Sequence, residues 1–263
     1  MPVSLFTYNI GVCSIASGSK GNATYITDRE TGILIDAGIS AKEILRRLST
    51  KNISHHNIHA IVISHEHDDH ISGLCSLSKK YKLPVYVTRA TLEQIHKKHK
   101  PIDNVRYFEC GMDFSINNLH IHPFSISHDA VDPSGFTISK ADSKVGIATD
   151  LGIATHMVKT HLDGCQLIII EANHDPVMLK RGPYPWHLKQ RIQSRLGHLS
   201  NEQTRDLLTE IMHPQLCYVV LGHMSEKNNT TQRALDVISQ VIPLDQVSLT
   251  IAPQHECGEM RFV

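Results

Sequence analysis

The six residues HEHDDH, His65 to His70, constrain this chain more than any other stretch. They directly follow the apolar residues 59–64, HAIVIS, which predict a buried strand. Side chains alternate along a strand, so its end can aim His65 and His67 at one point, while Asp69 and His70 fall in the next turn and can aim at a second. With 19 histidines in 263 residues, the chance expectation for this HxHxDH pattern is about 0.006. The pattern therefore predicts a metal site rather than a solvated polar loop.

The residue types limit which metal this site suits. Histidine nitrogens combined with carboxylate oxygens are typical of zinc, manganese or iron sites. A helical zinc-protease motif is excluded, because its second histidine would stand four residues after His65, where this chain has Asp69.

Composition excludes several classes of protein. Lys plus Arg is 26 and Asp plus Glu is 26, so the formal net charge is zero. The overall charge therefore gives no indication of a nucleic-acid or membrane partner. Hydrophobic residues make up 41% of the chain, and its longest apolar runs, such as QLIIIEA, fall far short of the roughly 20 residues that span a bilayer. The six cysteines form no CxxC pair, and the opening MPVSLFTYN lacks the features of a signal peptide. We therefore expect a cytoplasmic protein with no membrane association.

The order of predicted elements indicates an α/β fold with two mixed halves. Strands dominate residues 10–36 and 105–149, and strands alternate with helices elsewhere. We expect two sheets packed together with helices on the outside. Helices are expected over 41–49, 71–81, 90–100, 155–162, 187–196, 201–212 and 229–241.

HxHxDH after an apolar strand resembles the metallo-β-lactamase superfamily, and four further residues stand in that family's order. Each follows an apolar strand: Asp36 in LIDAG, His128 in FSISHDA, Asp150 in IATDLG and His223 in VVLGHMS. The resemblance implies a four-layer αβ/βα sandwich and a hydrolytic centre with two divalent metal ions, zinc first, with manganese or iron as alternatives. It also implies the ligands: His65, His67 and His128 for one ion, Asp69, His70 and His223 for the other, Asp150 bridging both, and Asp36 orienting the metal loop from behind.

Further segments resemble the YycJ (WalJ) family. They are SIASGSKGNATYI, EANHDPVML with the following GPYP and LKQRI, GHLSN, and LGHMSEKNN. The similarity leaves residues 1–9 as a short extension of one domain spanning 1–263. It implies 5′-to-3′ exonuclease activity on single-stranded DNA with a part in DNA repair. The chain is also similar, more distantly, to ribonuclease Z through the order of Glu171, His198 and His223.

The same residues suit phosphodiester hydrolysis. Two metal ions would hold a hydroxide that attacks phosphorus in line, and would neutralise charge on the phosphoryl oxygens. The leaving 3′ oxygen needs a proton, and His198 is our candidate donor, with Glu171 holding it in the right tautomer or keeping it charged. Asp69 is a candidate acceptor for a proton from the nucleophile. The structural alternative for His198 is a residue leading into a helix capped by Ser200 and Gln203.

Candidate substrate contacts come first from the loop SGSKGN. It offers backbone amides and three polar side chains to a phosphate: Ser19, Lys20 and Asn22. The structural alternative is an ordinary turn between strands.

A basic segment supplies the other candidate contacts. Residues 176–201 contain five Lys or Arg residues and no acid, so the segment could track a nucleic-acid backbone near the metals. Within or just before it we select His174, Arg181 and Tyr184, the last as a platform on which a base stacks. The alternative is a solvated helix face with its aromatic residues packed beneath.

Three functions remain open at this point. A nuclease acting on DNA is the interpretation that GHLSN and LGHMSE favour, with an RNA-processing nuclease as its variant. A small-molecule hydrolase of glyoxalase II or lactonase type shares the metal loop but lacks its own substrate signatures here. A non-catalytic member is disfavoured, because every ligand position holds a competent ligand. The sequence leaves the oligomeric state open.

Overall fold

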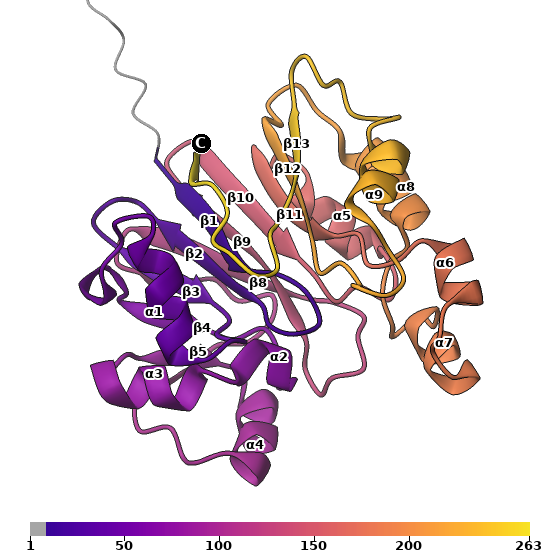
Figure 1. Ribbon diagram of the computed structural model, residues 1–263. Coiled ribbons are helices and arrows are strands. Elements are labelled where there is room, and N and C mark those ends of the chain that lie inside the picture. Colours follow the sequence, from indigo (N-terminus) through magenta and orange to yellow (C-terminus); the bar gives the residue numbers. More distant parts are fainter. Residues whose placement is uncertain (1–8) are drawn as a thin grey trace, which may run out of the picture.

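The first of two sheets lies on the indigo side of the molecule in Figure 1, a computed structural model in which residues 9–263 are described. Residues 1–8, nearly all of the expected extension, lie outside the described part. The strands of this sheet are β1 (Gly11–Ala16), β2 (Ala23–Thr27), β3 (Gly32–Ile35), β4 (Ala60–Val62), β5 (Val85–Val87), β6 (Val105–Tyr107) and β14 (Arg261–Phe262). Their order is β14-β1-β2-β3-β4-β5-β6, so the C-terminal strand closes the sheet beside β1.

The second sheet also has seven strands and faces the first. They are β7 (Phe114–Ile116), β8 (Leu119–Ser125), β9 (Ser134–Lys140), β10 (Ser143–Ala148), β11 (Leu167–Glu171), β12 (Tyr218–Gly222) and β13 (Ser248–Ile251). Their order is β13-β12-β11-β10-β9-β8-β7. Antiparallel hairpins therefore occupy one side of each sheet, and parallel strands the other.

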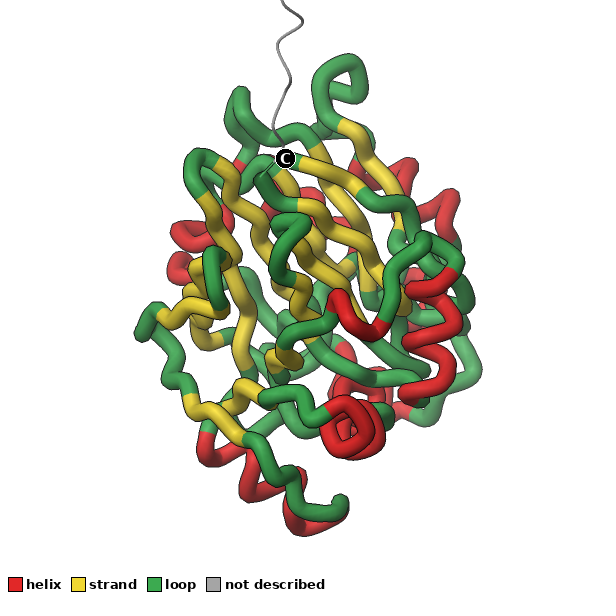
Figure 2. The backbone as a smooth tube through the Cα atoms, turned by 90° about the vertical axis from the view of Figure 1, so that its left-hand side faces the viewer, coloured by secondary structure: helices red, strands yellow, loops and turns green. Residues whose placement is uncertain are grey.

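Helices cover the outer face of each sheet, and Figure 2 shows the strands in the middle with helices at the periphery. Over the first sheet lie α1 (Ala41–Ser49), α2 (Asp68–Ile71), α3 (Leu74–Tyr81) and α4 (Arg89–Lys98), with a short 3₁₀ turn, η1 (His55–Asn57). On the side of the second sheet lie α5 (His156–Leu162), α6 (Pro176–Arg181), α7 (Trp186–Ile192), α8 (Asn201–Ile211) and α9 (Thr231–Ile238). The expected four-layer αβ/βα sandwich is confirmed.

Three apolar cores hold these layers together. The middle one joins the two sheets, with Ile33 and Val62 of the first sheet in one cluster with Ile138 and Val145 of the second. The outer two lie between each sheet and its own helices. Burying one such aliphatic side chain stabilises the fold by about 1.5–3 kcal/mol, so the continuous apolar strands of the sequence are what position the layers.

Some predicted helices differ from the observed ones. The helix expected over 71–81 begins three residues later, as α3, and Ile71 ends the short helix α2. Gly73 lies between the two helices, where a Cβ would lie 2.2 Å from the carbonyl oxygen of Ile39. The basic helix expected over 187–196 ends at Ile192, and the residues after it form a loop. Helix α6 was not predicted, although Asp175 caps it and Pro176 occupies its first turn. The Ser200 and Gln203 capping box is confirmed.

Candidate active site

Parallel strands of both sheets end at one edge, where the chain turns sharply. Asp36 follows β3, Asp150 follows β10 and His223 follows β12, and these residues have φ angles of 62°, 60° and 49°. Non-glycine residues seldom adopt this left-handed conformation, and Asp and His tolerate it better than most. These turns direct side chains from distant parts of the sequence toward one another.

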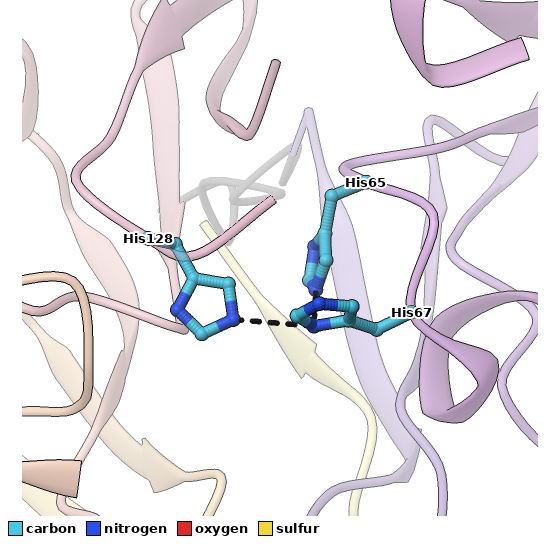
Figure 3. Close-up of side chains that lie close together, drawn as sticks. All are labelled: His65, His67 and His128. Atoms are coloured by element: carbon cyan, nitrogen blue, oxygen red, sulfur yellow. Dashed lines mark hydrogen bonds between the residues drawn. The ribbon is translucent and has the colours of Figure 1, made fainter. Parts of the chain in front are cut away.

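Three histidines form the first cluster at this edge (Figure 3). The Nδ1 atom of His67 lies 3.1 Å from Nε2 of His65 and 3.3 Å from Nε2 of His128. Burial holds the pKa of His65 well below its usual range and also lowers that of His128. Neutral imidazoles present lone pairs, and three ring nitrogens crowded at one point fit a shared metal ion.

Asp69, His70 and His223 form the second cluster. Oδ2 of Asp69 lies 3.4 Å from Nε2 of His223 and 3.7 Å from Nε2 of His70. Burial acts against charge on His223, but Asp150, Asp69 and Glu171 outweigh it and raise its pKa to about 10. The pKa of His70 is likewise raised well above its usual value, by Asp36 and Asp150 against burial. This cluster therefore attracts positive charge, which protons or metal ions can supply.

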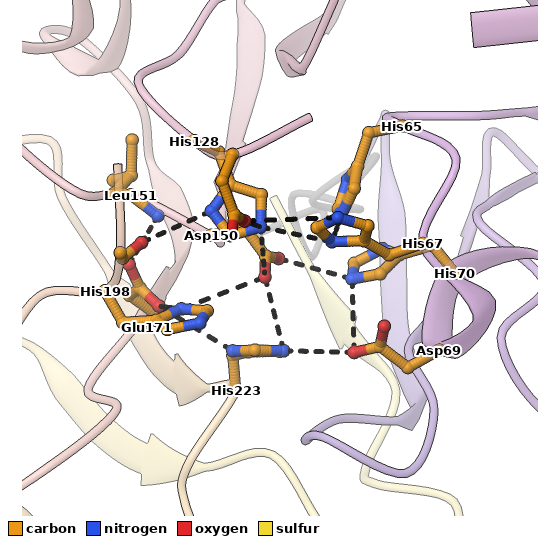
Figure 4. A network of polar contacts seen from close by, with 12 residues as sticks. His65, His67, Asp69, His70, His128, Asp150, Leu151, Glu171, His198 and His223 are labelled. Carbon is orange, nitrogen blue, oxygen red and sulfur yellow. Dashed lines mark hydrogen bonds and ion pairs between the residues drawn. The ribbon is translucent and has the colours of Figure 1, made fainter. Parts of the chain in front are cut away.

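Asp150 joins the two clusters (Figure 4). Its Oδ1 atom lies 3.4 Å from Nε2 of His223 and 3.7 Å from Nε2 of His128, and its Oδ2 atom lies 3.3 Å from Nε2 of His70. Only 2% of the residue is exposed, and although Oδ2 faces His70, it accepts no hydrogen bond of good geometry within residues 9–263. A buried carboxylate oxygen seldom stays unsatisfied, so this position fits a bridging metal ligand.

The loop carrying Asp69 is supported by Asn22 and Gly38. The backbone N–H of Asn22 donates to the carbonyl oxygen of Asp69 over 2.7 Å, and a Cβ on Gly38 would lie 1.7 Å from that oxygen. The N–H of Gly18 donates to Oδ1 of Asn22, which turns its Nδ2 atom toward Nε2 of His70 at 3.1 Å. Glycine at position 38 is what allows this close approach.

His198 and Glu171 form a pair beside the clusters, in which Glu171 is fully buried and His198 is partly exposed. Nδ1 of His198 lies 3.1 Å from Oε2 of Glu171, while Oε1 of Glu171 accepts the backbone N–H of Leu199 over 3.1 Å. Burial acts to raise the pKa of Glu171, but His198 and His223 lower it overall, so the carboxyl stays ionised. The ring of His198 stacks on that of His223, with centroids 5.0 Å apart.

A cavity of about 250 Å³ opens onto these side chains. His198, Asp150 and both clusters contribute to its wall, as do two of the candidate substrate contacts, Ser19 and Tyr184. The cavity is large enough for a phosphate and part of a nucleotide.

Four other candidate contacts lie away from this cavity. Lys20 forms an ion pair with Glu226 at 2.7 Å on the exposed rim. Asn22 is 7% exposed and His174 is 2% exposed, so in this structure Asn22 supports the metal loop and His174 packs beside Ser200. Arg181 ends α6 outside the cavity wall. Asn22, His174 and Arg181 stay predictions as substrate contacts, and none of the three lines this cavity.

The sequence interpretation missed Asp129, and it named Arg191 only as one of the basic residues of segment 176–201 without selecting it as a contact. Both line the cavity, and Oδ1 of Asp129 lies 3.3 Å from Nε2 of His128. Of the five Lys and Arg residues described in segment 176–201, Arg191 is the one that lines the cavity. Asp129 could have been found from the sequence, because it directly follows His128. Nothing local distinguished Arg191 from its basic neighbours.

The chain is similar to several known proteins. Residues 31–224, which include every clustered side chain, match the family described as beta-lactamase superfamily domain. The exodeoxyribonuclease YycJ of Bacillus anthracis is 32% identical over 230 residues, 87% of each chain. The exodeoxyribonuclease WalJ of Streptococcus pneumoniae serotype 2 is 34% identical over 245 residues, 91% of this chain and 90% of that protein. The metallo-beta-lactamase fold protein YhfI from Bacillus subtilis has the same fold, with a TM-score of 0.74 at 17% identity over 95% of this chain and 99% of that one. Within residues 9–263, every helix is too short or too polar to cross a bilayer.

Proposed function

This chain belongs to the metallo-β-lactamase superfamily, and on that premise we propose that it is a metal-dependent nuclease that removes nucleotides from the 5′ end of single-stranded DNA. The observation that carries the proposal is the convergence of two ligand clusters on Asp150 inside one cavity. The names of the relatives from Bacillus anthracis and Streptococcus pneumoniae, both exodeoxyribonucleases, favour DNA as the substrate.

The proposed ligand sets follow the two clusters. His65, His67 and His128 would hold one divalent ion, and Asp69, His70 and His223 the other, with Asp150 bridging them. Zinc suits this mixture of imidazole and carboxylate, and manganese or iron are alternatives. Bound ions would supply an activated water and neutralise charge on the phosphate oxygens.

The chain's own contribution to bond cleavage is a proton for the leaving oxygen. Glu171 accepts a hydrogen bond from Nδ1 of His198, which leaves Nε2 of that ring to carry the transferable proton into the cavity. Glu171 is itself fixed by the backbone N–H groups of Leu151 and Leu199. This support holds the imidazole in one orientation, as a general acid requires. Asp69 also lies at the cavity wall and would take a proton from the attacking water. Metal ligation would reduce its basicity and so limit this role.

The proposal includes a cytoplasmic location and a part in DNA repair. The location rests on the sequence, whose six cysteines form no CxxC pair. The repair role follows only from the similarity of the chain to its relatives.

The experiment is digestion of end-labelled nucleic acids by the purified protein after zinc or manganese is added. Single- and double-stranded DNA and RNA are compared, each labelled at the 5′ or the 3′ end. Release of labelled mononucleotides from 5′-labelled single-stranded DNA at the earliest times is the expected result. Preferential digestion of RNA would change the substrate class. Digestion of no nucleic acid would favour a small-molecule hydrolase, which thioester and lactone substrates would then test.

A further inference from the structure

One wall of the cavity is built by helix α7, and Arg191 projects from it. The Nε–H of Arg191 donates to Oδ2 of Asp129, and the remaining N–H groups of its guanidinium contact no acceptor within residues 9–263. The side chain is 58% exposed and lines the cavity with Tyr184. A guanidinium has five N–H donors, so Arg191 can hold Asp129 and bind an anion at the same time.

The segment after α7 is attached to the loops that carry the metal ligands. Ser127 Oγ donates to the carbonyl oxygen of Arg195 over 2.7 Å, and the N–H of Asp129 donates to that of Leu196 over 3.1 Å. A Cβ on Gly152 would lie 2.1 Å from the carbonyl oxygen of Arg195, so the segment also packs directly against the turn that follows Asp150. These contacts fix the position of Arg191 relative to the clusters.

Asp129 links Arg191 to the first cluster. Oδ1 of Asp129 lies 3.3 Å from Nε2 of His128 and is buried without a hydrogen-bond partner within residues 9–263, while Oδ2 binds Arg191. Its carboxylate therefore lies at the cavity wall, paired with the guanidinium of Arg191. An unpaired carboxylate in this place would repel a phosphate, and the guanidinium of Arg191 offsets that repulsion.

We propose that Arg191 binds the phosphate of the substrate in this cavity and that Asp129 is the positioning residue that holds it there. The inference deepens the proposed nuclease function, because it names the residue that recognises a nucleotide phosphate beside the metal clusters. Tyr184 lies on the same wall and offers its ring to the sugar or base next to that phosphate. Among the basic residues of segment 176–201, phosphate binding is thus assigned to Arg191 and not to Arg181.

The test is equilibrium binding of thymidine 5′-monophosphate to the metal-loaded protein, measured by calorimetry. This nucleotide has no phosphodiester bond to cleave, so its binding is measurable whether or not the protein is a nuclease. Replacing Arg191→Ala should raise Kd about ten- to a hundred-fold, as expected for loss of hydrogen bonds to a charged group. Arg191→Lys should restore part of the affinity, because it returns the charge without the planar fork. Metal content measured on each variant should stay unchanged.

Arg195→Ala is the matched control. It removes the same charge four residues along the chain from an exposed side chain outside the cavity wall, and Kd should change less than about twofold. The Asp129→Asn variant should also weaken binding, by less than Arg191→Ala. With 5′-phosphorylated DNA as substrate, Arg191→Ala should raise KM far more than it lowers kcat.

Three outcomes would overturn the inference. They are no binding of thymidine monophosphate by the wild-type protein, equal Kd values for wild type and Arg191→Ala, or equal losses for Arg191→Ala and Arg195→Ala. Failure of the nuclease proposal is a separate result, because it would appear as wild-type protein that binds the nucleotide but cleaves no nucleic acid.

Discussion

Nδ1 of His70 lies 2.7 Å from Oδ2 of Asp36, and both side chains are almost fully buried. Ser64 completes the arrangement, donating from its backbone N–H and its hydroxyl to the same carboxylate, each over 2.8 Å. A carboxylate that accepts a hydrogen bond from Nδ1–H fixes the histidine tautomer, so Nε2, which faces Asp150 and Asp69, is the nitrogen that can offer a lone pair to a metal ion. Asp36 thus determines how a residue 34 positions later can act as a ligand.

Replacing Asp36→Ala should therefore weaken metal binding without removing a ligand. Loss of such a supporting carboxylate typically lowers metal affinity about 10- to 100-fold. The measurement is competition for zinc between the protein and a chromophoric chelator, with Asp28→Ala as control, a buried aspartate that pairs with Lys140 away from the site. Equal zinc affinities in wild type and Asp36→Ala would contradict this role.

The candidate site residues could be proposed from the sequence because they follow apolar strands. Asp36, His128, Asp150 and His223 each come after a different buried strand, and strands that run in the same direction within a sheet bring these residues to one edge. A local pattern was therefore enough to suggest a site assembled from the whole chain.

The cavity wall could not be predicted in the same way. Arg191 acquires its place from a partner 62 residues away, and nothing in its own segment separates it from Arg181. The loop of Asn22 was predicted to receive a phosphate, but whether its side chain faced the cavity depended on the backbone contact with Asp69. Such contacts follow from tertiary packing, which the period of a strand or helix does not encode.

A second prediction concerns His198. The His198→Ala variant should lower kcat for DNA cleavage about 10²- to 10⁴-fold, because a positioned general acid contributes that much. Its metal content should equal that of wild type, since Nδ1 is held by Glu171 and Nε2 is left for the substrate. Steady-state kinetics and metal analysis on the same preparation provide the check.

Glu171→Gln provides the companion variant for that experiment. The amide keeps the size of the side chain but removes the charge that faces Nδ1 of His198, so kcat should fall by less than in His198→Ala. If His198→Ala loses a metal ion, the residue is a ligand rather than the proton donor.

Removing metal should lower the stability of the fold. Asp69, Asp150 and Glu171 lie close together, and bound cations would offset the repulsion among them. A ligand that binds only the folded state at 100 times its Kd adds about 2.7 kcal/mol to the free energy of unfolding. Thermal unfolding with a chelator should therefore show a lower Tm, which added zinc restores. An Asp150→Ala variant without metal is the control, and the chelator should leave its Tm unchanged. If the chelator also left the Tm of wild type unchanged, that result would contradict the two-cluster assignment.

The pair Asp28–Lys140 predicts a pH-dependent stability that is separate from the metals. Asp28 follows β2 of the first sheet and Lys140 ends β9 of the second, and their charged atoms lie 2.7 Å apart. Burial acts to raise the pKa of Asp28, but Lys140 and the backbone amides of Thr31 and Glu30 lower it overall. Asp28→Asn should reduce the free energy of unfolding by about 1–3 kcal/mol at neutral pH, because a buried charged hydrogen bond is lost.

The sign of the pH dependence follows from that lowered pKa. The unfolded chain binds a proton at Asp28 more readily than the folded chain does, so the pair stabilises the fold fully above about pH 4, the usual pKa of aspartate. The contribution disappears as the pH falls through the lower pKa of the folded state. Urea unfolding of wild type and Asp28→Asn, with chelator present so that metal loss plays no part, should give a difference that is constant from pH 7 to about pH 5 and shrinks below about pH 4. The exposed Asp142→Asn serves as control, and a difference that grows on acidification would show that the pair does not stabilise the fold through the charge of Asp28.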